Sequence, residues 1–303
     1  MHDITQNIIN ATGRIILGKE PQIRLALACI LARGHLLIED LPGMGKTTLS
    51  HTLAQVLGLE FNRVQFTSDL LPADILGISV FDRNSAAFKF HPGPVFTNVL
   101  LADEINRATP KTQSALLEVM EESQVTLEGE TRKLPQPFFV IATQNPTHHI
   151  GTYPLPESQL DRFLMRIALD YPDSASEREL LKGHGGRSHV PEIEPSTHAA
   201  ELLQLQQAVG QIRVSDALLD YLQALLAYSR NSGRYTAGLS PRAGLALKNC
   251  AQAWALMQGR DFVLPEDVQA VLPGVAGHRL RTTGGLEDPQ DAAAHLLHAV
   301  AIP

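Results

Sequence analysis

Short apolar runs that end in polar residues recur along the first half of the chain. Four of them have the length and the flanks of buried strands, namely "HLLIE" at 35–39, "FNRVQF" at 61–66, "VLLADE" at 99–104 and "FFVIATQN" at 138–145. After the first run, "KTTLSHTLAQVLG" has apolar residues at helical spacing and ends at Gly58. Strands that alternate with helices predict an α/β fold with a parallel sheet flanked by helices, whose ligands bind at the carboxyl ends of the strands.

Two further segments alternate apolar and polar residues on both sides of a turn. They are "ISVFDRNSAAFKFHPGPVF" at 78–96, which turns at "RNSAA", and "QVTLEGETRKL" at 124–134, which turns at "EGE". Both patterns predict β-hairpins. From the residues alone, an exposed hairpin without a role is as good an interpretation as a functional one.

The character of the chain changes after about residue 183. The segment "GHGGRSHVPEIEPST" at 183–197 is a polar connection that contains Gly and Pro, and only helical patterns follow it. We therefore predict a boundary between Lys182 and Pro195. It separates an αβα core with two hairpin insertions, residues 1–185, from an all-helical domain, residues 191–303.

The composition is typical of a soluble globular protein. The 303 residues are 44% hydrophobic, which is enough for a large buried core. Aromatic residues make up only 5%, and the many Ala and Leu residues of the second half favour helices there. The net charge of -7 at pH 7 gives no overall attraction to nucleic acid or to an anionic membrane, although it does not exclude a local basic groove.

The chain carries no targeting pattern that we recognise. The start "MHDITQNIIN" lacks the basic residues and the apolar core of a signal peptide, and the longest apolar run, "IRLALACILARG", is shorter than a membrane span. Cys29 and Cys250 each lie in an apolar, helix-like run, which predicts buried structural thiols in a reducing compartment. We therefore expect a cytoplasmic protein without membrane insertion.

The segment "LIEDLPGMGKTTLS" at 37–50 connects the first predicted strand to the following helix, as a phosphate-binding (Walker A) loop does. Gly43 and Gly45 would let backbone N–H groups approach the phosphates, and Lys46 would reach the β- and γ-phosphates. The Thr47 hydroxyl is a candidate Mg²⁺ ligand. A tight turn with a solvated lysine is the alternative. The predicted ATP-binding residues of this loop are Pro42, Gly43, Met44, Gly45, Lys46, Thr47 and Thr48.

Asp40 occupies the position where the strict pattern Gly-x-x-x-x-Gly-Lys-[Ser/Thr] has its first glycine. If that position needs a left-handed backbone, aspartate tolerates it better than most residues do. A carboxylate that faced a triphosphate would be repelled. We therefore expect the Asp40 side chain to turn away from the phosphates and to shape the loop.

A second motif, "NVLLADEINRA", places Asp103 and Glu104 at the carboxyl end of a buried strand (Walker B). Hydrolysis of a nucleotide needs one acid near Mg²⁺ and a second acid that orients and deprotonates the attacking water. We assign the first role to Asp103 and the second to Glu104. A solvated strand end is the alternative, and the upstream lysine loop argues against it.

Three longer segments resemble the MoxR family of AAA+ ATPases, in its helix-2-insert branch. They are "FTSDLLPADILG" at 66–77, "LADEINRATPKTQSALLEVMEE" at 101–122 and "ATQNP" at 142–146, and the resemblance extends over nearly the whole chain. The family's loop has "PGxGKT" as its constant part and a variable earlier position, so Asp40 is within its range. The resemblance implies an AAA+ P-loop NTPase core, a C-terminal helical lid and hairpins that face the central pore or a partner.

The resemblance also implies catalytic roles. Asn145 matches the sensor-1 position, which orients the attacking water, although from the residues alone it also reads as the cap of a turn. In "LPESQLDRFLMRI", Arg162 matches the arginine finger, which acts on the nucleotide of a neighbouring subunit. From the residues alone Arg162 reads as a surface ion pair with its neighbour. Arg166 and Arg107 are weaker candidates for the finger.

In the helical half, "GLSPRAGLAL" predicts a helix with Ser240 as its N-cap and Pro241 as its first residue. Arg242 then matches the sensor-2 arginine that contacts phosphates. Its place in the first helical turn is unfavourable with the helix dipole, which suggests a functional reason. The adenine base is expected near residues 16–19, with Leu17 and Gly18 as contacts.

Four of the histidines occur in close pairs, His148 with His149 and His184 with His189. Neither pair has the spacing of a zinc site, so we expect no bound transition metal.

The leading hypothesis is an ATP hydrolase that uses Mg²⁺. The resemblance implies a homo-oligomeric ring, of six subunits, that moves its lid to remodel, mature or activate client proteins, including clients with a von Willebrand factor A domain. A nucleic-acid motor or loader is the second hypothesis, because hairpins at these positions contact DNA in related helicases, but the acidic charge balance argues against it. A small-molecule kinase would leave the hairpins unexplained, and a non-hydrolysing switch would leave the two acids unexplained.

Overall fold

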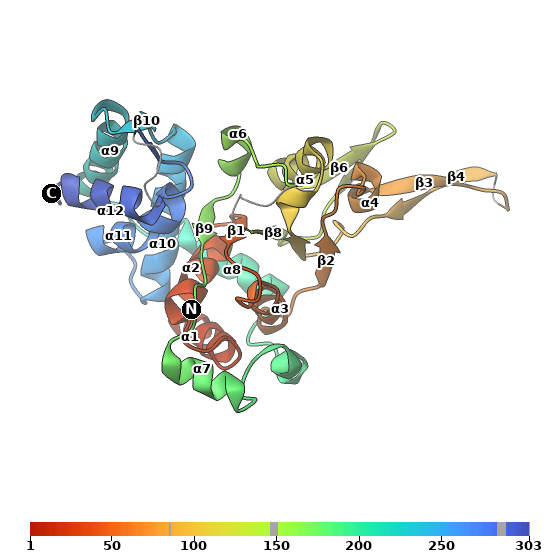
Figure 1. Ribbon diagram of the computed structural model, residues 1–303, viewed down its shortest axis with the longest axis horizontal. Coiled ribbons are helices and arrows are strands. Elements are labelled where there is room, and N and C mark those ends of the chain that lie inside the picture. The colour runs from red at the N-terminus through yellow and green to blue at the C-terminus, as the bar shows by residue number, and fades with distance from the viewer. Residues whose placement is uncertain (85, 146–150, 284–288, 303) are drawn as a thin grey trace.

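A five-stranded parallel sheet forms the centre of the computed structural model, which describes residues 1–84, 86–145, 151–283 and 289–302 (Figure 1). The strand order is β2–β5–β8–β1–β9, and every pairing is parallel. The strands are β1 (Leu36–Glu39), β2 (Phe61–Gln65), β5 (Val99–Asp103), β8 (Phe139–Gln144) and β9 (Met165–Ile167). The first four lie where the apolar runs predicted them. β9 was not predicted, because three residues with a central arginine do not stand out as an apolar run.

Alternate residues of the strands face opposite sides of the sheet. Leu36 and Ile38 join one hydrophobic cluster, while Leu37 between them joins the other. The first cluster contains α1 (His2–Gly13), α2 (Glu20–Leu31) and α3 (Lys46–Val56), and the second contains α4 (Pro72–Leu76) and α5 (Pro110–Glu122). Helices therefore cover both faces, as predicted. The connections contain η1 (Ile105–Arg107), α6 (Glu157–Leu160), α7 (Ser174–Leu181) and η2 (Arg187–Glu192).

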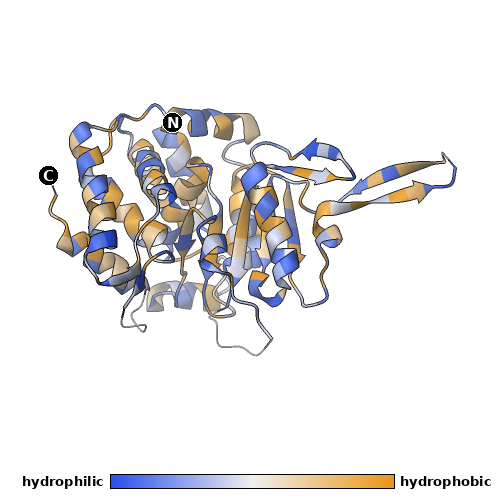
Figure 2. Cartoon of the chain, turned by 90° about the horizontal axis from the view of Figure 1, so that it is seen from above, coloured by the Kyte–Doolittle hydropathy of each residue, from blue (hydrophilic) through white to orange (hydrophobic). Residues whose placement is uncertain are grey.

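Both predicted hairpins are present. The first pairs β3 (Gly77–Asp82) with β4 (Ala87–Pro92), and the second pairs β6 (Gln124–Leu127) with β7 (Glu130–Lys133). The first hairpin extends far from the body of the molecule, and hydrophobic residues colour much of its length (Figures 1 and 2). The guanidinium of Arg132 lies 4.1 Å above the ring of Phe90, so a cation–π contact joins the two hairpins.

The second half of the chain is helical, as predicted, with one exception. Its helices are α8 (Ala199–Val209), α9 (Asp216–Asn231), α10 (Pro241–Met257), α11 (Pro265–Ala276) and α12 (Pro289–Ala299). The Ser240 hydroxyl accepts a hydrogen bond from the Ala243 N–H at 3.1 Å, which confirms the predicted cap of α10. The exception is a small antiparallel ribbon of β10 (Tyr235–Ala237) and β11 (Arg281–Thr282), so residues 191–303 are not all-helical.

The hydrophobic core is continuous across the predicted domain boundary. The first cluster contains residues of α8, α10 and α11 together with those of α1, α2 and the sheet. The amide of Gln206 in α8 donates to the carbonyl of Ile30 in α2 at 2.8 Å. The boundary near residues 182–195 therefore marks a change of architecture, while the two parts share one core. No helix in the described ranges is long and apolar enough to span a membrane.

A buried arginine joins the C-terminal helices to the loop that precedes β9. Arg279, whose side chain is 6% exposed, makes an ion pair with Asp161 at 2.6 Å and also donates to the Phe163 carbonyl at 2.8 Å. Burial lowers the pKa of Arg279, while the Asp161 carboxylate acts in the opposite direction. A buried cation of this kind is tolerated because its donors have fixed acceptors.

We expect Arg279→Ala to lower the free energy of unfolding by about 3 kcal/mol, because it removes the guanidinium that pairs with the Asp161 carboxylate and donates to four backbone carbonyls. Arg213 is the matched control: its ion pair with Asp261 is more than 70% exposed on both sides, so Arg213→Ala should cost less than about 1 kcal/mol. Urea unfolding followed by circular dichroism measures both. Equal midpoints for the two variants would contradict the structural role of Arg279.

Candidate functional site

The phosphate loop, residues 40–47, connects the carboxyl end of β1 to the N-terminus of α3. Gly43 and Gly45 have φ angles of 85° and 90°, in the left-handed region where a side chain is unfavourable, so glycine is needed at both. Gly45 is the N-cap of α3, and Lys46 is its first residue. The free N–H groups and the positive end of the helix dipole therefore face the space above the loop, where an anion would bind.

Lys46 is largely buried, with the residue only 8% exposed. It donates to the Asp40 carbonyl at 2.5 Å and to Asn145 Oδ1 at 2.8 Å. Burial lowers the pKa of Lys46, while the carboxylates of Asp40, Asp103 and Glu104 act in the opposite direction. The structure therefore brings the predicted lysine and the predicted sensor-1 residue into direct contact.

Asp103 is held from both sides of its strand. Thr143 Oγ1 of β8 donates to its Oδ1 at 2.5 Å, and the guanidinium of Arg63 in β2 donates to its Oδ2 at 2.7 Å. The hydroxyl of Thr47 lies 3.4 Å from the same Oδ2 atom. A hydroxyl beside a carboxylate is a donor set that suits Mg²⁺, which takes its remaining ligands from phosphate oxygens and water.

Glu104 has a left-handed backbone, with φ 55° and ψ 49°, which costs a residue with a side chain roughly 1 kcal/mol or more. Its carboxylate accepts hydrogen bonds from Gln65 Nε2 at 3.0 Å, from Arg107 at 2.8 Å and from Asn145 Nδ2 at 3.3 Å. Arg107, a weaker candidate for the finger, is therefore an ion-pair partner of Glu104 within the same chain. Asn145 joins Lys46 to Glu104 through the two ends of its amide.

Sequence reasoning missed Arg63, Gln65 and Thr143. The first two alternate along β2, "FNRVQF", and point to the same side of the sheet. The register pairs Gln65 with Asp103, which explains why polar side chains at this strand end reach the two acids. The only local signal was the presence of polar residues at the ends of otherwise apolar runs.

A cavity of about 410 Å³ lies beside the loop. It is bounded by the loop, by the segment predicted to contact adenine and by the residues that follow β9. The lining includes Ile16, Leu17, Lys19, Gly43, Met44, Gly45, Thr48, Asp170, Tyr171 and Pro172. Gly18 is not among the lining residues; it lies close to the start of α7, where a Cβ atom would meet the Ser176 hydroxyl. Residues 170–172 were not predicted.

Asp40 turns its carboxylate into the protein. Its oxygens accept hydrogen bonds from the backbone N–H groups of Leu41, Leu169 and Asp170, each at 2.7 Å. This agrees with the expectation that the side chain avoids the phosphates. The left-handed conformation considered for this position is absent, since Asp40 is not among the described residues with a positive φ.

Arg162 and Arg242 lie together on a different part of the surface. Arg162 donates to the Leu117 carbonyl at 2.8 Å, and the two guanidiniums lie 3.1 Å and 2.6 Å from the two carboxylate oxygens of Glu121. Both belong to the lining of a pocket that contains no residue of the phosphate loop. Arg166, the other candidate finger, makes an ion pair with Glu39 at 2.8 Å. The structure therefore does not bring Arg162 or Arg242 to Lys46 of the same chain.

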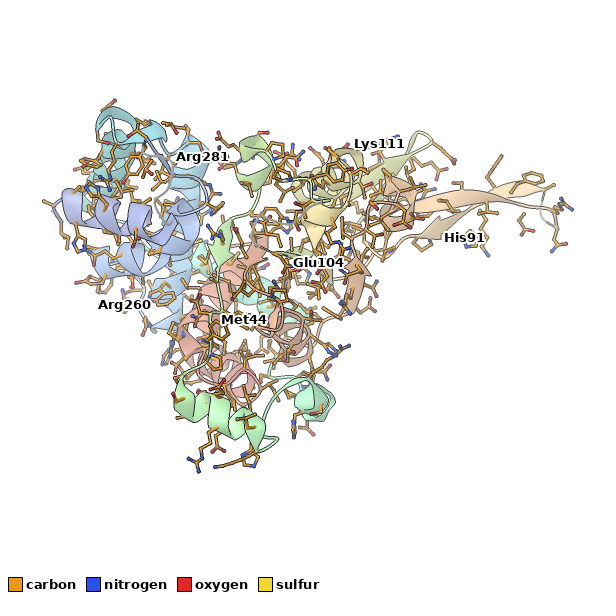
Figure 3. All side chains as sticks on the ribbon, viewed as in Figure 1. Met44, His91, Glu104, Lys111, Arg260 and Arg281 are labelled. Atoms are coloured by element: carbon orange, nitrogen blue, oxygen red, sulfur yellow. The ribbon has the colours of Figure 1, made fainter. Side chains whose placement is uncertain are left out.

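Among the described residues, no cluster of three or more His, Cys, Asp or Glu side chains could hold a metal ion. His184 contacts Glu179 at 2.7 Å, and His189 contacts the Gly185 carbonyl at 2.6 Å. His148 and His149 lie outside the described residues. Figure 3 labels Met44 and Glu104 near the middle of the molecule, well away from His91 on the hairpin and from Arg260 in the connection between α10 and α11.

Comparison with known proteins gives consistent results along the chain. Residues 35–165 match the family described as "ATPase family associated with various cellular activities (AAA)", and residues 227–297 match the AAA lid domain. The chain is 41% identical to chaperone MoxR1 of Mycobacterium tuberculosis, over 96% of this chain and 80% of that protein. It is 32% identical to protein MoxR of Paracoccus denitrificans, over 93% and 90%.

An uncharacterized Bacillus subtilis protein, YeaC, is 42% identical over 92% of this chain and 88% of its own length. The crystal structure of a proposed ATPase from Cytophaga hutchinsonii superimposes with a TM-score of 0.89 at 34% identity, over 100% of this chain and 96% of that one. The α/β core and the helical lid are thus confirmed by both kinds of comparison. The chain belongs to the MoxR family of AAA+ ATPases.

Proposed function

We propose that this protein hydrolyses Mg-ATP in a ring of six subunits and uses the reaction to remodel, mature or activate client proteins. Membership of an ATPase family supports hydrolysis at a general level. The observation that carries the proposal is the hydrogen-bonded chain Lys46–Asn145–Glu104, because it joins a phosphate-binding lysine to a carboxylate that can act on water.

In the proposed reaction, the residues of one chain bind the nucleotide and activate the attacking water. Lys46, whose ammonium has three donors, would keep the Asp40 carbonyl and turn toward the β- and γ-phosphates. Thr47 and Asp103 would hold Mg²⁺, which would neutralise phosphate charge. Glu104 accepts a proton from the attacking water, and Asn145 orients that water. Leu17 and Gly18, with the rest of residues 16–19, are the proposed contacts of the base. Pro42, Met44 and Thr48 complete the proposed nucleotide-binding loop.

Arg162 and Arg242 are proposed to act on the nucleotide of a neighbouring subunit. Both guanidiniums are partly exposed and share Glu121, and neither contacts the loop of its own chain within the described residues. An arginine that stabilises charge developing on the γ-phosphate has to reach a phosphate, so a second copy of the chain is the natural source. This arrangement supports a ring, in which each interface uses two different surfaces of the subunit.

The first hairpin is proposed to contact clients. Four of its exposed side chains are large and apolar, which suits contact with unfolded or mobile protein segments; they are Ile78, Val80, Phe81 and Phe88. The net charge of -7 and these apolar side chains favour a protein client over nucleic acid. One relative is named a chaperone. The resemblance to the family extends the proposal to clients with a von Willebrand factor A domain, in the cytoplasm, where the buried thiols of Cys29 and Cys250 stay reduced.

We expect Glu104→Gln to bind ATP with nearly unchanged affinity and to lower kcat by about 100-fold or more, because the amide cannot accept the proton of water. Glu118→Gln, on the exposed face of α5, is the control and should keep the normal rate. Phosphate release and ATP binding are measured on the same preparations. Near-normal turnover of Glu104→Gln would exclude Glu104 as the base.

Mixing experiments test whether Arg162 acts on a neighbouring subunit. Arg162→Ala and Lys46→Ala should each be nearly inactive, and an equal mixture should regain activity, because about a quarter of the interfaces then combine an intact loop with an intact arginine. A mixture of Lys46→Ala with Glu104→Gln is the control, since both changes lie in the same half of the site and no intact site forms. Absence of recovery at every ratio of the first pair would rule out action between subunits.

A further inference from the structure

Asp40 connects two walls of the nucleotide cavity that are far apart in the sequence. The residue is 7% exposed. One carboxylate oxygen accepts from the N–H of Leu41, and the other accepts from the N–H groups of Leu169 and Asp170, all at 2.7 Å. Hydrogen bonds to an ionised carboxylate are stronger than those between neutral groups. The first glycine of the strict loop pattern could make none of these bonds.

The position of Asp40 at the end of a strand explains why a side chain is needed. The ladder between β1 and β9 ends at the pair Ile38 and Ile167. Beyond that pair β1 turns into the phosphate loop, while the backbone N–H of Asp40 still bonds to Gln144 of β8 at 3.2 Å. The carboxylate of Asp40 therefore continues the connection to the chain after β9, where no ladder pair is formed.

The segment that Asp40 holds forms one side of the cavity. Residues 170–172, here called the far wall, line it together with Gly43, Met44 and Gly45 of the loop. Asp170 has a φ of 56°, so the chain turns sharply where Asp40 binds it. The Tyr171 carbonyl also accepts a hydrogen bond from Lys19 Nζ at 2.6 Å, which ties the far wall to the predicted base-contacting segment.

The other end of Asp40 faces the phosphate side of the cavity. Its backbone carbonyl accepts the Lys46 ammonium at 2.5 Å. Asp40 thus makes two contacts. Its main chain contacts Lys46, the lysine that would bind phosphate, and its side chain contacts the far wall.

We infer that Asp40 is a positioning residue that couples the phosphate loop to the far wall, so that the phosphates and the nucleoside of one nucleotide are bound together. The inference rests on the proposed nucleotide site and adds a specificity role to it. Charge alone gives the opposite expectation, because removing a carboxylate near the phosphates should strengthen anion binding. The direction in which nucleotide affinity changes when Asp40 is replaced therefore distinguishes a positioning role from an electrostatic one.

The test compares Mg-ADP with Mg-pyrophosphate, which lacks the nucleoside and cannot use the far wall. Calorimetric titration of Asp40→Asn and Asp40→Gly should show ADP affinity lowered about tenfold, with pyrophosphate affinity unchanged or higher. Asp40→Gly is informative because it restores the strict pattern. Glu39→Gln is the matched control, since it removes a neighbouring charge that pairs with Arg166 and makes no bond to the far wall.

The outcomes are distinct. An equal loss for ADP and pyrophosphate, or a gain in ADP affinity, would overturn the coupling while leaving the nucleotide site intact. A wild-type protein that binds neither compound would overturn the proposed function itself. Hydrogen exchange of the wild type gives a second measurement if a variant fails to fold: Mg-ADP should slow exchange at the Leu169 and Asp170 amides more than Mg-pyrophosphate does. Equal exchange with the two ligands would refute the coupling.

Discussion

The buried ammonium of Lys46 is the interaction on which the rest of the site depends. A cation removed from water is costly unless fixed acceptors surround it, and here the Asp40 carbonyl and the Asn145 amide oxygen provide them. Because Lys46 takes the oxygen of Asn145, the nitrogen of that amide faces the carboxylate of Glu104. The charge of Lys46 therefore sets the orientation of the Asn145 amide. The resulting hydrogen bonds connect the start of α3 to the ends of β8 and β5.

Much of this arrangement was predictable from the sequence, for physical reasons that differ between elements. β1, β5 and β8 are buried on both faces, so they appear as continuous apolar runs, and the glycines of the loop mark backbone angles that other residues avoid. The hairpins alternate apolar and polar residues because successive side chains of a strand point to opposite faces of the ribbon. These signals are local. Asp103 and Glu104 could be predicted from them because the two acids come directly after an apolar run.

The parts that were missed depend on which strands become neighbours. Arg63 and Thr143 reach Asp103 from β2 and β8, on either side of β5, and no local pattern states that order. Asp40 is a further case: its partners lie 129 and 130 residues away, after a strand too short to be recognised. The sequence showed that glycine was missing, and only the fold explains what the aspartate does instead.

The environment of the acids also depends on an edge strand of the sheet. β2 lies at an edge and pairs with β5 alone, yet it supplies both Arg63 and Gln65, which hold Asp103 and Glu104. Glu104 additionally has an unfavourable backbone conformation, which persists because Thr143, Gln65 and Asn145 hold it from several directions. Because β2 continues through α4 into the projecting hairpin, the same chain segment carries the exposed apolar side chains of the hairpin and the groups that orient the acids.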